Sequence, residues 1–224
     1  MNWKLPNQLT VLRLLLAIVF FMLLALYEGP GGEAAGEQAQ RARLLLNVCF
    51  GLFILAGITD VLDGYLARRM KAVSAFGRIT DPFVDKVLIC GAYALFTGSN
   101  FVFSAKLPMS SYEQHLPGWI TGHMASGVQA WMVVVVVARE FIVSGVRGYS
   151  ESRGQSFPAT VYGKLKMFTQ SVAIGTVLYQ LANLPETPWA IVTKLTAVWA
   201  SVLVTVFSGL AYVSKARKLM VSDE

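Results

Sequence analysis

The chain of 224 residues is poor in charged residues, which make up 14% of it, and it holds only two cysteines and two histidines. So little charge argues against an ordinary soluble domain. Cys49 and Cys90 lie in apolar runs, so they indicate buried hydrophobic residues rather than a disulfide framework. His115 and His123 fall in one polar stretch, and no zinc site of cysteine and histidine ligands is expected.

Hydrophobic residues, in contrast, make up 55% of the chain. A membrane-spanning helix needs about 20 predominantly apolar residues, and six stretches come close to that length. We therefore predict an all-α integral membrane protein that forms one domain over residues 1–224, with a short interfacial segment at residues 1–8 and a retained first anchor. The predicted spans are residues 9–27, 44–66, 83–97, 125–146, 161–181 and 189–213.

The charged residues that are present have an uneven distribution. The net charge of +6 comes from basic residues lying between apolar stretches, which favours lipid surfaces and anionic substrates over nucleic acid. With the N-terminus in the cytoplasm and six alternating spans, 15 of the 19 lysines and arginines fall on or near the cytoplasmic side. Cytoplasmic loops are rich in basic residues, so both termini are predicted to be cytoplasmic. The four exceptions are Arg41, Arg43, Lys106 and Lys194.

Four aspartates lie at the predicted cytoplasmic edge of the second and third spans. Asp60 and Asp63 are three residues apart, and Asp81 and Asp85 are four apart, so each pair shares one face of a helix. Asp81-Pro82 has the pattern of a helix start. Carboxylates at a membrane edge are costly, and oxygen ligands of this kind suit a hard divalent cation. The alternative is an ordinary salt-bridge cluster with Arg68, Arg69 and Arg78.

Four cations form a second candidate site. Arg139 and Arg147 are about two helical turns apart near the cytoplasmic end of the fourth span, and Lys164 and Lys166 open the fifth. Their convergence near the aspartates would suit an anionic acceptor such as glycerol 3-phosphate. Two alternatives stay open: these residues are positive-inside anchors for lipid headgroups, or Glu140 pairs with Arg139 in a structural role.

The pattern Asp60-x₂-Asp63-Gly64-x₂-Ala67-Arg68-x₈-Gly77-x₃-Asp81-x₃-Asp85 resembles the complete signature of the CDP-alcohol phosphatidyltransferases. The resemblance implies six helices around a site for two Mg²⁺ or Mn²⁺ ions at the cytoplasmic face, and a homodimer. It also implies that Asp60, Asp63 and Asp81 bind the metals, that Asp81 is shared, and that Asp85 is both ligand and general base. The residues implied to bind CDP-diacylglycerol are Asn7, Thr10, Gly64, Ala67, Arg68, Ser74 and Gly77.

The start of the chain, Leu5-Pro6-Asn7-Gln8-Leu9-Thr10-x₂-Arg13, is similar to the N-termini of bacterial phosphatidylglycerophosphate synthases within this family. That branch implies a bacterial inner-membrane enzyme of phospholipid biosynthesis that joins CDP-diacylglycerol and sn-glycerol 3-phosphate, releasing CMP. Two alternatives remain: a cardiolipin synthase that uses phosphatidylglycerol as acceptor, and a divalent-cation transporter whose aspartates line a path. The loop at residues 99–124 resembles nothing known to us.

Overall fold

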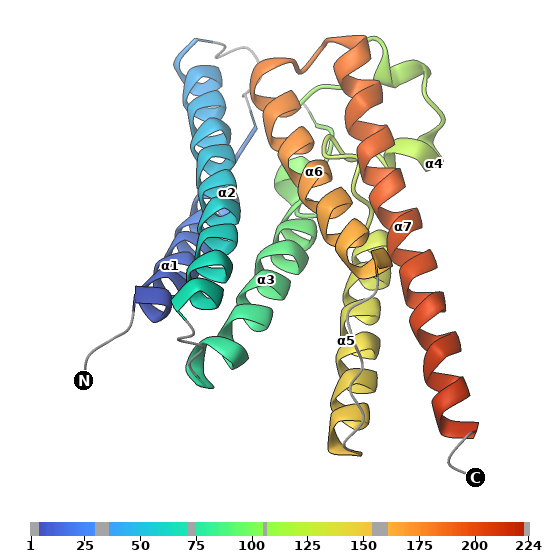
Figure 1. Ribbon diagram of the computed structural model, residues 1–224. Coiled ribbons are helices and arrows are strands. Elements are labelled where there is room, and N and C mark those ends of the chain that lie inside the picture. Colours follow the sequence, from blue (N-terminus) through green and yellow to red (C-terminus); the bar gives the residue numbers. More distant parts are fainter. Residues whose placement is uncertain (1–4, 30–35, 71–74, 105–106, 154–160, 222–224) are drawn as a thin grey trace.

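The computed structural model describes residues 5–29, 36–70, 75–104, 107–153 and 161–221 (Figure 1). Within these ranges, the side chains at 5–7, 63–70, 75–82, 151, 161–162 and 215–221 lie outside the description. Over the described residues the chain is helical and contains no strand, only two isolated β-bridges. The predicted all-α class is therefore confirmed.

Each predicted apolar stretch overlaps one long helix. The long helices are α1 (Leu5–Ala25), α2 (Glu37–Met70), α3 (Ala75–Leu95), α5 (Ala130–Ser152), α6 (Val161–Asn183) and α7 (Pro188–Val221). Among the described residues, Gln8–Ala25, Glu37–Leu62 and Pro188–Ser214 are long and apolar enough to cross a membrane. Charged side chains interrupt the apolar character of α3, α5 and α6, so the six-span arrangement stays a prediction for these three helices.

The predicted start of the third helix is wrong. The third helix does not begin at Asp81-Pro82 but at Ala75, so both residues lie inside α3. Pro82 lacks the N–H that would bond to the carbonyl of Arg78, and the loss of this one bond does not end the helix. The backbone of residues 5–8 forms the first turn of α1, and the apolar stretch long enough to span a membrane begins at Gln8, so the interfacial position of this segment stays a prediction. Residues 1–4 lie outside the described part of the chain.

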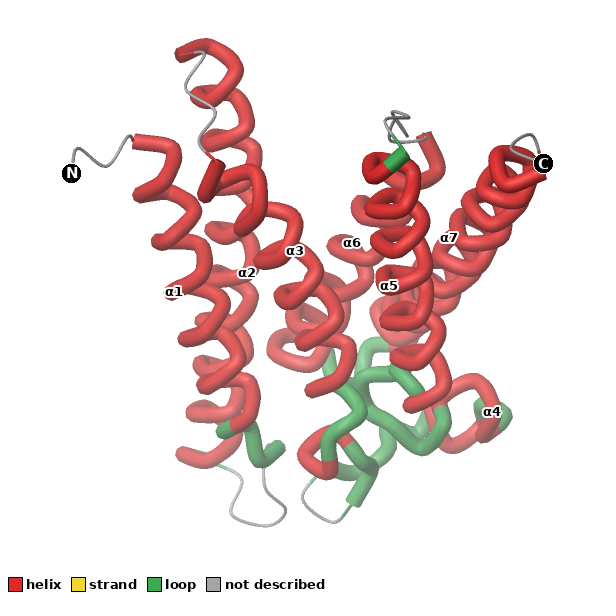
Figure 2. Tube along the Cα trace, turned by 90° about the horizontal axis from the view of Figure 1, so that it is seen from below, coloured by secondary structure: helices red, strands yellow, loops and turns green. Residues whose placement is uncertain are grey.

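The long helices pack as two groups that meet along the middle of the bundle. Helix α1 packs on α2 and α3, and α7 packs on α5 and α6. Contacts of α2 with α6, and of α3 with α5 and α6, join the groups (Figures 1 and 2). Fully buried side chains such as Phe20, Tyr93, Met132 and Leu178 fill the interior, while Met22, Phe141 and Phe207 are largely exposed. Large apolar residues on the outside suit contact with lipid.

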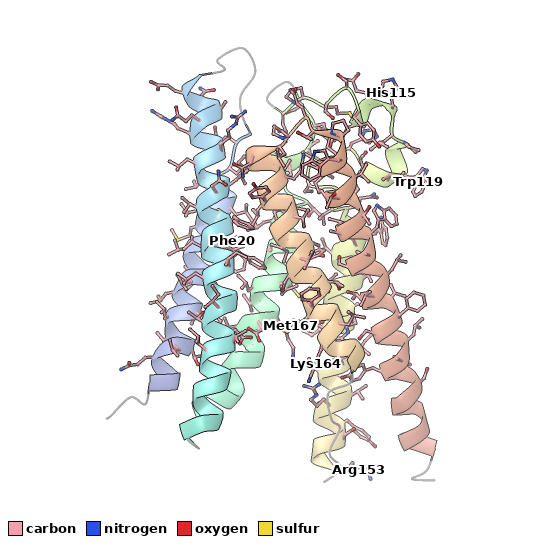
Figure 3. All side chains as sticks on the ribbon, turned by 45° about the horizontal axis from the view of Figure 1, so that its top comes forward. Phe20, His115, Trp119, Arg153, Lys164 and Met167 are labelled. Carbon is pink, nitrogen blue, oxygen red and sulfur yellow. The ribbon has the colours of Figure 1, made fainter. Side chains whose placement is uncertain are left out.

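Residues 98–104 and 107–129, here called the cap, cover the end of the bundle opposite the two chain ends (Figure 2). The sequence predicts a loop at residues 99–124, but this region contains η1 (Ser99–Phe101), η2 (Glu113–His115) and α4 (Gly118–Thr121). The fourth long helix begins at Ala130 rather than at the predicted residue 125, so residues 125–129 belong to the cap. The ring of Trp119 lies edge-on to Trp199 of α7, with centroids 5.8 Å apart. The cap is therefore packed against the bundle, far from the end that holds Arg153 and Lys164 (Figure 3).

Candidate functional site

Asp60 of α2 and Asp85 of α3 meet at the guanidinium group of Arg13 in α1. Arg13 Nη1 lies 2.6 Å from Asp60 Oδ1 and 3.2 Å from Asp85 Oδ1. The Arg13 side chain is completely buried, whereas those of Asp60 and Asp85 are 30% and 27% exposed. Three helices therefore bring one cation and two carboxylates to one point.

Arg13 is a residue whose importance the sequence analysis missed, because it was counted only as a positive-inside residue and as part of the N-terminal pattern. A usable signal was present in its surroundings, Val11-Leu12-Arg13-Leu14-Leu15-Leu16. An arginine inside a continuous apolar run is expensive without a charged partner. Such a position therefore predicts a carboxylate on a neighbouring helix.

The described carboxylates fit a divalent cation in chemistry and placement. Asp60 Oδ1 and Asp85 Oδ1 both lie within 3.2 Å of Arg13 Nη1, so the fold brings two side chains with hard oxygen atoms close together. The side chains of Asp63 and Asp81 lie outside the described part, and only their places in α2 and α3 are known. Among the described residues, no three potential ligands form a group.

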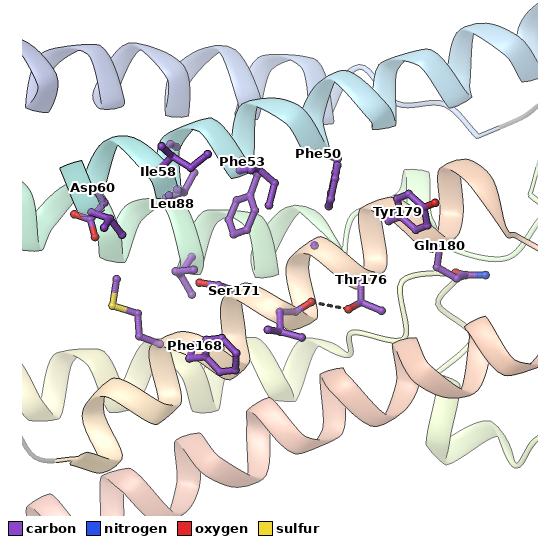
Figure 4. Close-up of a pocket in the computed structure, with 18 of the residues that line it drawn as sticks. Phe50, Phe53, Ile58, Asp60, Leu88, Phe168, Ser171, Thr176, Tyr179 and Gln180 are labelled. Atoms are coloured by element: carbon purple, nitrogen blue, oxygen red, sulfur yellow. Dashed lines mark hydrogen bonds between the residues drawn. The ribbon is translucent and has the colours of Figure 1, made fainter. Parts of the chain in front are cut away.

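A long apolar groove begins at the two carboxylates. It has a volume of about 790 Å³ and lies between α2 and α3 on one side and α6 and the start of α7 on the other. Asp60 lies at one end and Tyr179 and Gln180 at the other, with phenylalanines between them (Figure 4). Among the described residues that line it, Asp60 and Asp85 alone are charged. The described lining away from these two residues therefore offers no charged ligands along which an ion could pass.

Most of the residues predicted to bind CDP-diacylglycerol cannot be compared with the structure in detail. Thr10 is buried, on the same helix as Arg13. Ser74 lies outside the described residues, and for five others only the helical backbone is described. These are Asn7 in α1, Gly64, Ala67 and Arg68 in α2, and Gly77 in α3. Their proposed contacts stay predictions.

The four predicted acceptor-binding cations fall into two kinds. Arg139 and Lys166 are buried and share Glu140: Arg139 Nη1 donates to Oε1 of Glu140 over 3.0 Å and Lys166 Nζ donates to the same oxygen over 2.5 Å. Arg139 Nη2 also donates to Ser208 Oγ over 2.7 Å, and its guanidinium lies 5.3 Å from the ring centre of Tyr212. The pairing of Arg139 with Glu140, considered above as an alternative, is therefore present.

Arg147 and Lys164 are the other kind. Arg147 is half-buried and Lys164 is exposed, and neither forms an ion pair with a described residue. Lys86 of α3 adds a cation that the sequence analysis did not single out. Its Nζ donates to Ser144 Oγ over 2.6 Å, and Ser144 in turn donates to the carbonyl oxygen of Glu140. Two successive hydrogen bonds thus connect Lys86 on α3 to Glu140, the residue that pairs with Arg139 and Lys166.

Comparison with known proteins supports the family that the aspartate signature resembles. The profile of the CDP-alcohol phosphatidyltransferase family matches residues 3–207. The chain is 31% identical to the CDP-diacylglycerol–glycerol-3-phosphate 3-phosphatidyltransferase of Bacillus subtilis, over 95% of each chain. It is 35% identical to a probable phosphatidylglycerophosphate synthase of Mycobacterium tuberculosis, over 95% of this chain and 81% of that one.

The chain has the features of a helical membrane protein, with two aspartates at the head of an apolar groove. It belongs to the CDP-alcohol phosphatidyltransferase family, as the signature between Asp60 and Asp85 predicts. It is therefore a transferase, and the divalent-cation transporter considered from the sequence is set aside.

Proposed function

We propose that this enzyme transfers the phosphatidyl group of CDP-diacylglycerol to sn-glycerol 3-phosphate, giving phosphatidylglycerophosphate and CMP. The observation that carries the proposal is the position of Asp60 and Asp85 at the head of the apolar groove. Relatives in Bacillus subtilis and Rickettsia felis, named as CDP-diacylglycerol–glycerol-3-phosphate 3-phosphatidyltransferases, match 95% and 96% of the chain. Both support the same acceptor.

The groove suits the diacylglycerol part of the donor. Its lining includes Phe53, Leu88 and Phe168, and it ends near Tyr179. Ile58 and Phe168 on its two sides are 50% and 67% exposed, so an acyl chain could enter from the membrane between α2 and α6. Because acyl chains leave an equally apolar membrane, packing contacts with the groove wall would hold them there. The pyrophosphate would then lie beside the aspartates.

Two Mg²⁺ or Mn²⁺ ions bound by Asp60, Asp63, Asp81 and Asp85 would neutralise the charge that develops on the donor pyrophosphate. Asp60 and Asp85 fit this role because both line the head of the groove, beside the proposed place of the pyrophosphate. Asp81, one turn before Asp85 on α3, is assigned the shared position by its place in the signature.

Asp85 is proposed to accept the proton from the C1 hydroxyl of glycerol 3-phosphate. The hydroxyl oxygen forms a bond to the phosphorus that carries diacylglycerol. The bond from that phosphorus to the bridging oxygen breaks, and its electron pair leaves with CMP. Helix α3 fixes Asp85 at the head of the groove, where the acceptor must meet the lipid phosphate.

Arg139, Arg147, Lys164 and Lys166 are proposed to attract and bind the acceptor phosphate. Arg147 and Lys164 would contact it directly, because their charges are not used in ion pairs with described residues. Arg139 and Lys166 are held by Glu140, so they would supply positive potential and a rigid wall. An exposed lysine at this end of the bundle (Figure 3) suits a water-soluble anion.

We further propose that the enzyme lies in the bacterial inner membrane as a six-span homodimer, with both termini and the aspartates on the cytoplasmic side. Both chain ends lie at the end of the bundle where α2 finishes and α3 begins (Figure 1), as this topology requires. Cysteine labelling at the two ends of α7 in intact cells would test the orientation.

An acceptor competition tests the proposed reaction. Purified enzyme would receive CDP-diacylglycerol with equal concentrations of glycerol 3-phosphate and phosphatidylglycerol. We expect phosphatidylglycerophosphate and CMP to form in equal amounts, with no cardiolipin. Cardiolipin as the product would instead identify the lipid acceptor.

A further inference from the structure

We propose that Arg13 is a positioning residue that holds Asp60 and Asp85 from behind, so that their outward oxygens are placed to bind metal. The inference rests on the proposed function, since it concerns how the metal ligands are held. Its starting point is that one nitrogen, Arg13 Nη1, contacts a carboxylate oxygen on each of two helices.

The direction of approach supports this role. The groove that begins at Asp60 and Asp85 is lined by residues of α2, α3, α6 and α7, and by none of the described residues of α1. Arg13 is 0% exposed, while the two aspartates are partly exposed. The arginine therefore contacts the carboxylates on the side facing α1, while both aspartates also line the groove.

The chemistry of arginine suits such a position. A guanidinium group stays charged under all ordinary conditions and presents several donors in a fixed plane, so it can bond two carboxylates at once. Asp60 and Asp85, whose Oδ1 atoms both contact Arg13 Nη1, would otherwise repel each other. Groups that hydrogen-bond to metal ligands orient those ligands, and their removal typically weakens metal binding by about 10–100-fold.

Mn²⁺ binding to detergent-purified enzyme, measured from the electron paramagnetic resonance signal of free Mn²⁺, tests the inference without turnover. We expect Arg13→Gln to weaken Mn²⁺ binding by at least about tenfold, and Arg13→Lys to lie between that variant and the wild type. Lys194→Met is the matched control, because it also breaks a buried ion pair but in the cap. It should bind Mn²⁺ as the wild type does.

The Mn²⁺ affinities of the variants distinguish the possible roles of Arg13. Wild-type Mn²⁺ affinity in folded Arg13→Gln would make Arg13 a packing residue only, and tighter binding would make it a competitor of the metal. Either result overturns the inference. If Arg13→Gln does not fold, Arg13→Lys decides: weaker binding supports the inference and unchanged binding overturns it. Absence of Mn²⁺ binding by the wild type would instead contradict the metal site of the proposed function.

Discussion

Lys194 of α7 donates to Oε1 of Glu113 in the cap over 3.2 Å and to the carbonyl oxygen of Ala125 over 2.6 Å. Both charged side chains are at least 95% buried. The contact links the cap to the bundle at the end opposite the aspartates, so its role is expected to be in stability and not in catalysis.

Replacing Lys194 with Met should therefore destabilise the protein, because it leaves the Glu113 carboxylate buried without its charged partner. Breaking a buried ion pair in this way typically costs about 3–5 kcal/mol. Thermal unfolding in detergent would show a lower Tm for Lys194→Met and a partial recovery for Lys194→Met combined with Glu113→Leu. An unchanged Tm in the single variant would show that the pair does not hold the cap.

A second prediction concerns the acyl groove at Gly175 of α6. A Cβ atom there would lie 3.5 Å from Phe50, an ordinary contact, so Gly175→Ala should be tolerated and serves as the control. Gly175→Phe should fill the groove. Displacing the acyl chain should raise KM for long-chain CDP-diacylglycerol severalfold above that of Gly175→Ala, because the chain loses its packing contacts with the groove wall. Equal KM values for the two variants would mean that acyl chains bind elsewhere.

The two kinds of cation should respond differently to substitution. Lys164→Ala should raise KM for glycerol 3-phosphate about tenfold, since a hydrogen bond to a charged group is worth about 1.5–3 kcal/mol, and should leave the Tm unchanged. Lys166→Ala should lower the Tm, because it removes a partner of buried Glu140. The assignment fails if Lys164→Ala leaves the acceptor KM unchanged.

The aspartate signature leads to a prediction about metal. Chelation with EDTA should stop turnover, and added Mg²⁺ or Mn²⁺ should restore it. Asp81→Asn should abolish turnover at all metal concentrations, because the signature gives Asp81 the shared ligand position. Activity of Asp81→Asn close to that of the wild type would contradict the two-metal assignment.

The positions of the six long helices were predictable, because long apolar runs have few alternatives to a helix. The ends of these helices were not predictable from hydropathy. An apolar stretch marks only the part of a helix that is suited to the membrane, and the backbone hydrogen bonds continue into the polar residues beyond it. Helix α2 begins at Glu37, seven residues before the predicted apolar span, through Gln38, Gln40 and Arg41. Pro82 was interpreted as a helix start, but it is accommodated within α3.

Spacing alone predicts that Asp60 and Asp63, and likewise Asp81 and Asp85, lie about one turn apart on a helix, and the backbones of α2 and α3 confirm this. The long-range contacts were not predictable in this way. Arg13 and Asp85 are 72 positions apart in the sequence, and Lys194 and Glu113 are 81 apart. Only the packing of α1 on α3, and of the cap on α7, brings these charges together.

The most direct test of the account is the reaction itself. Purified enzyme in mixed micelles would be given CDP-diacylglycerol, radiolabelled sn-glycerol 3-phosphate and Mg²⁺, and the lipid phase analysed for label. We predict labelled phosphatidylglycerophosphate, formed together with an equal amount of CMP and only when the divalent cation is present. Enzyme that is folded and metal-loaded but transfers no label to lipid would contradict the proposed function.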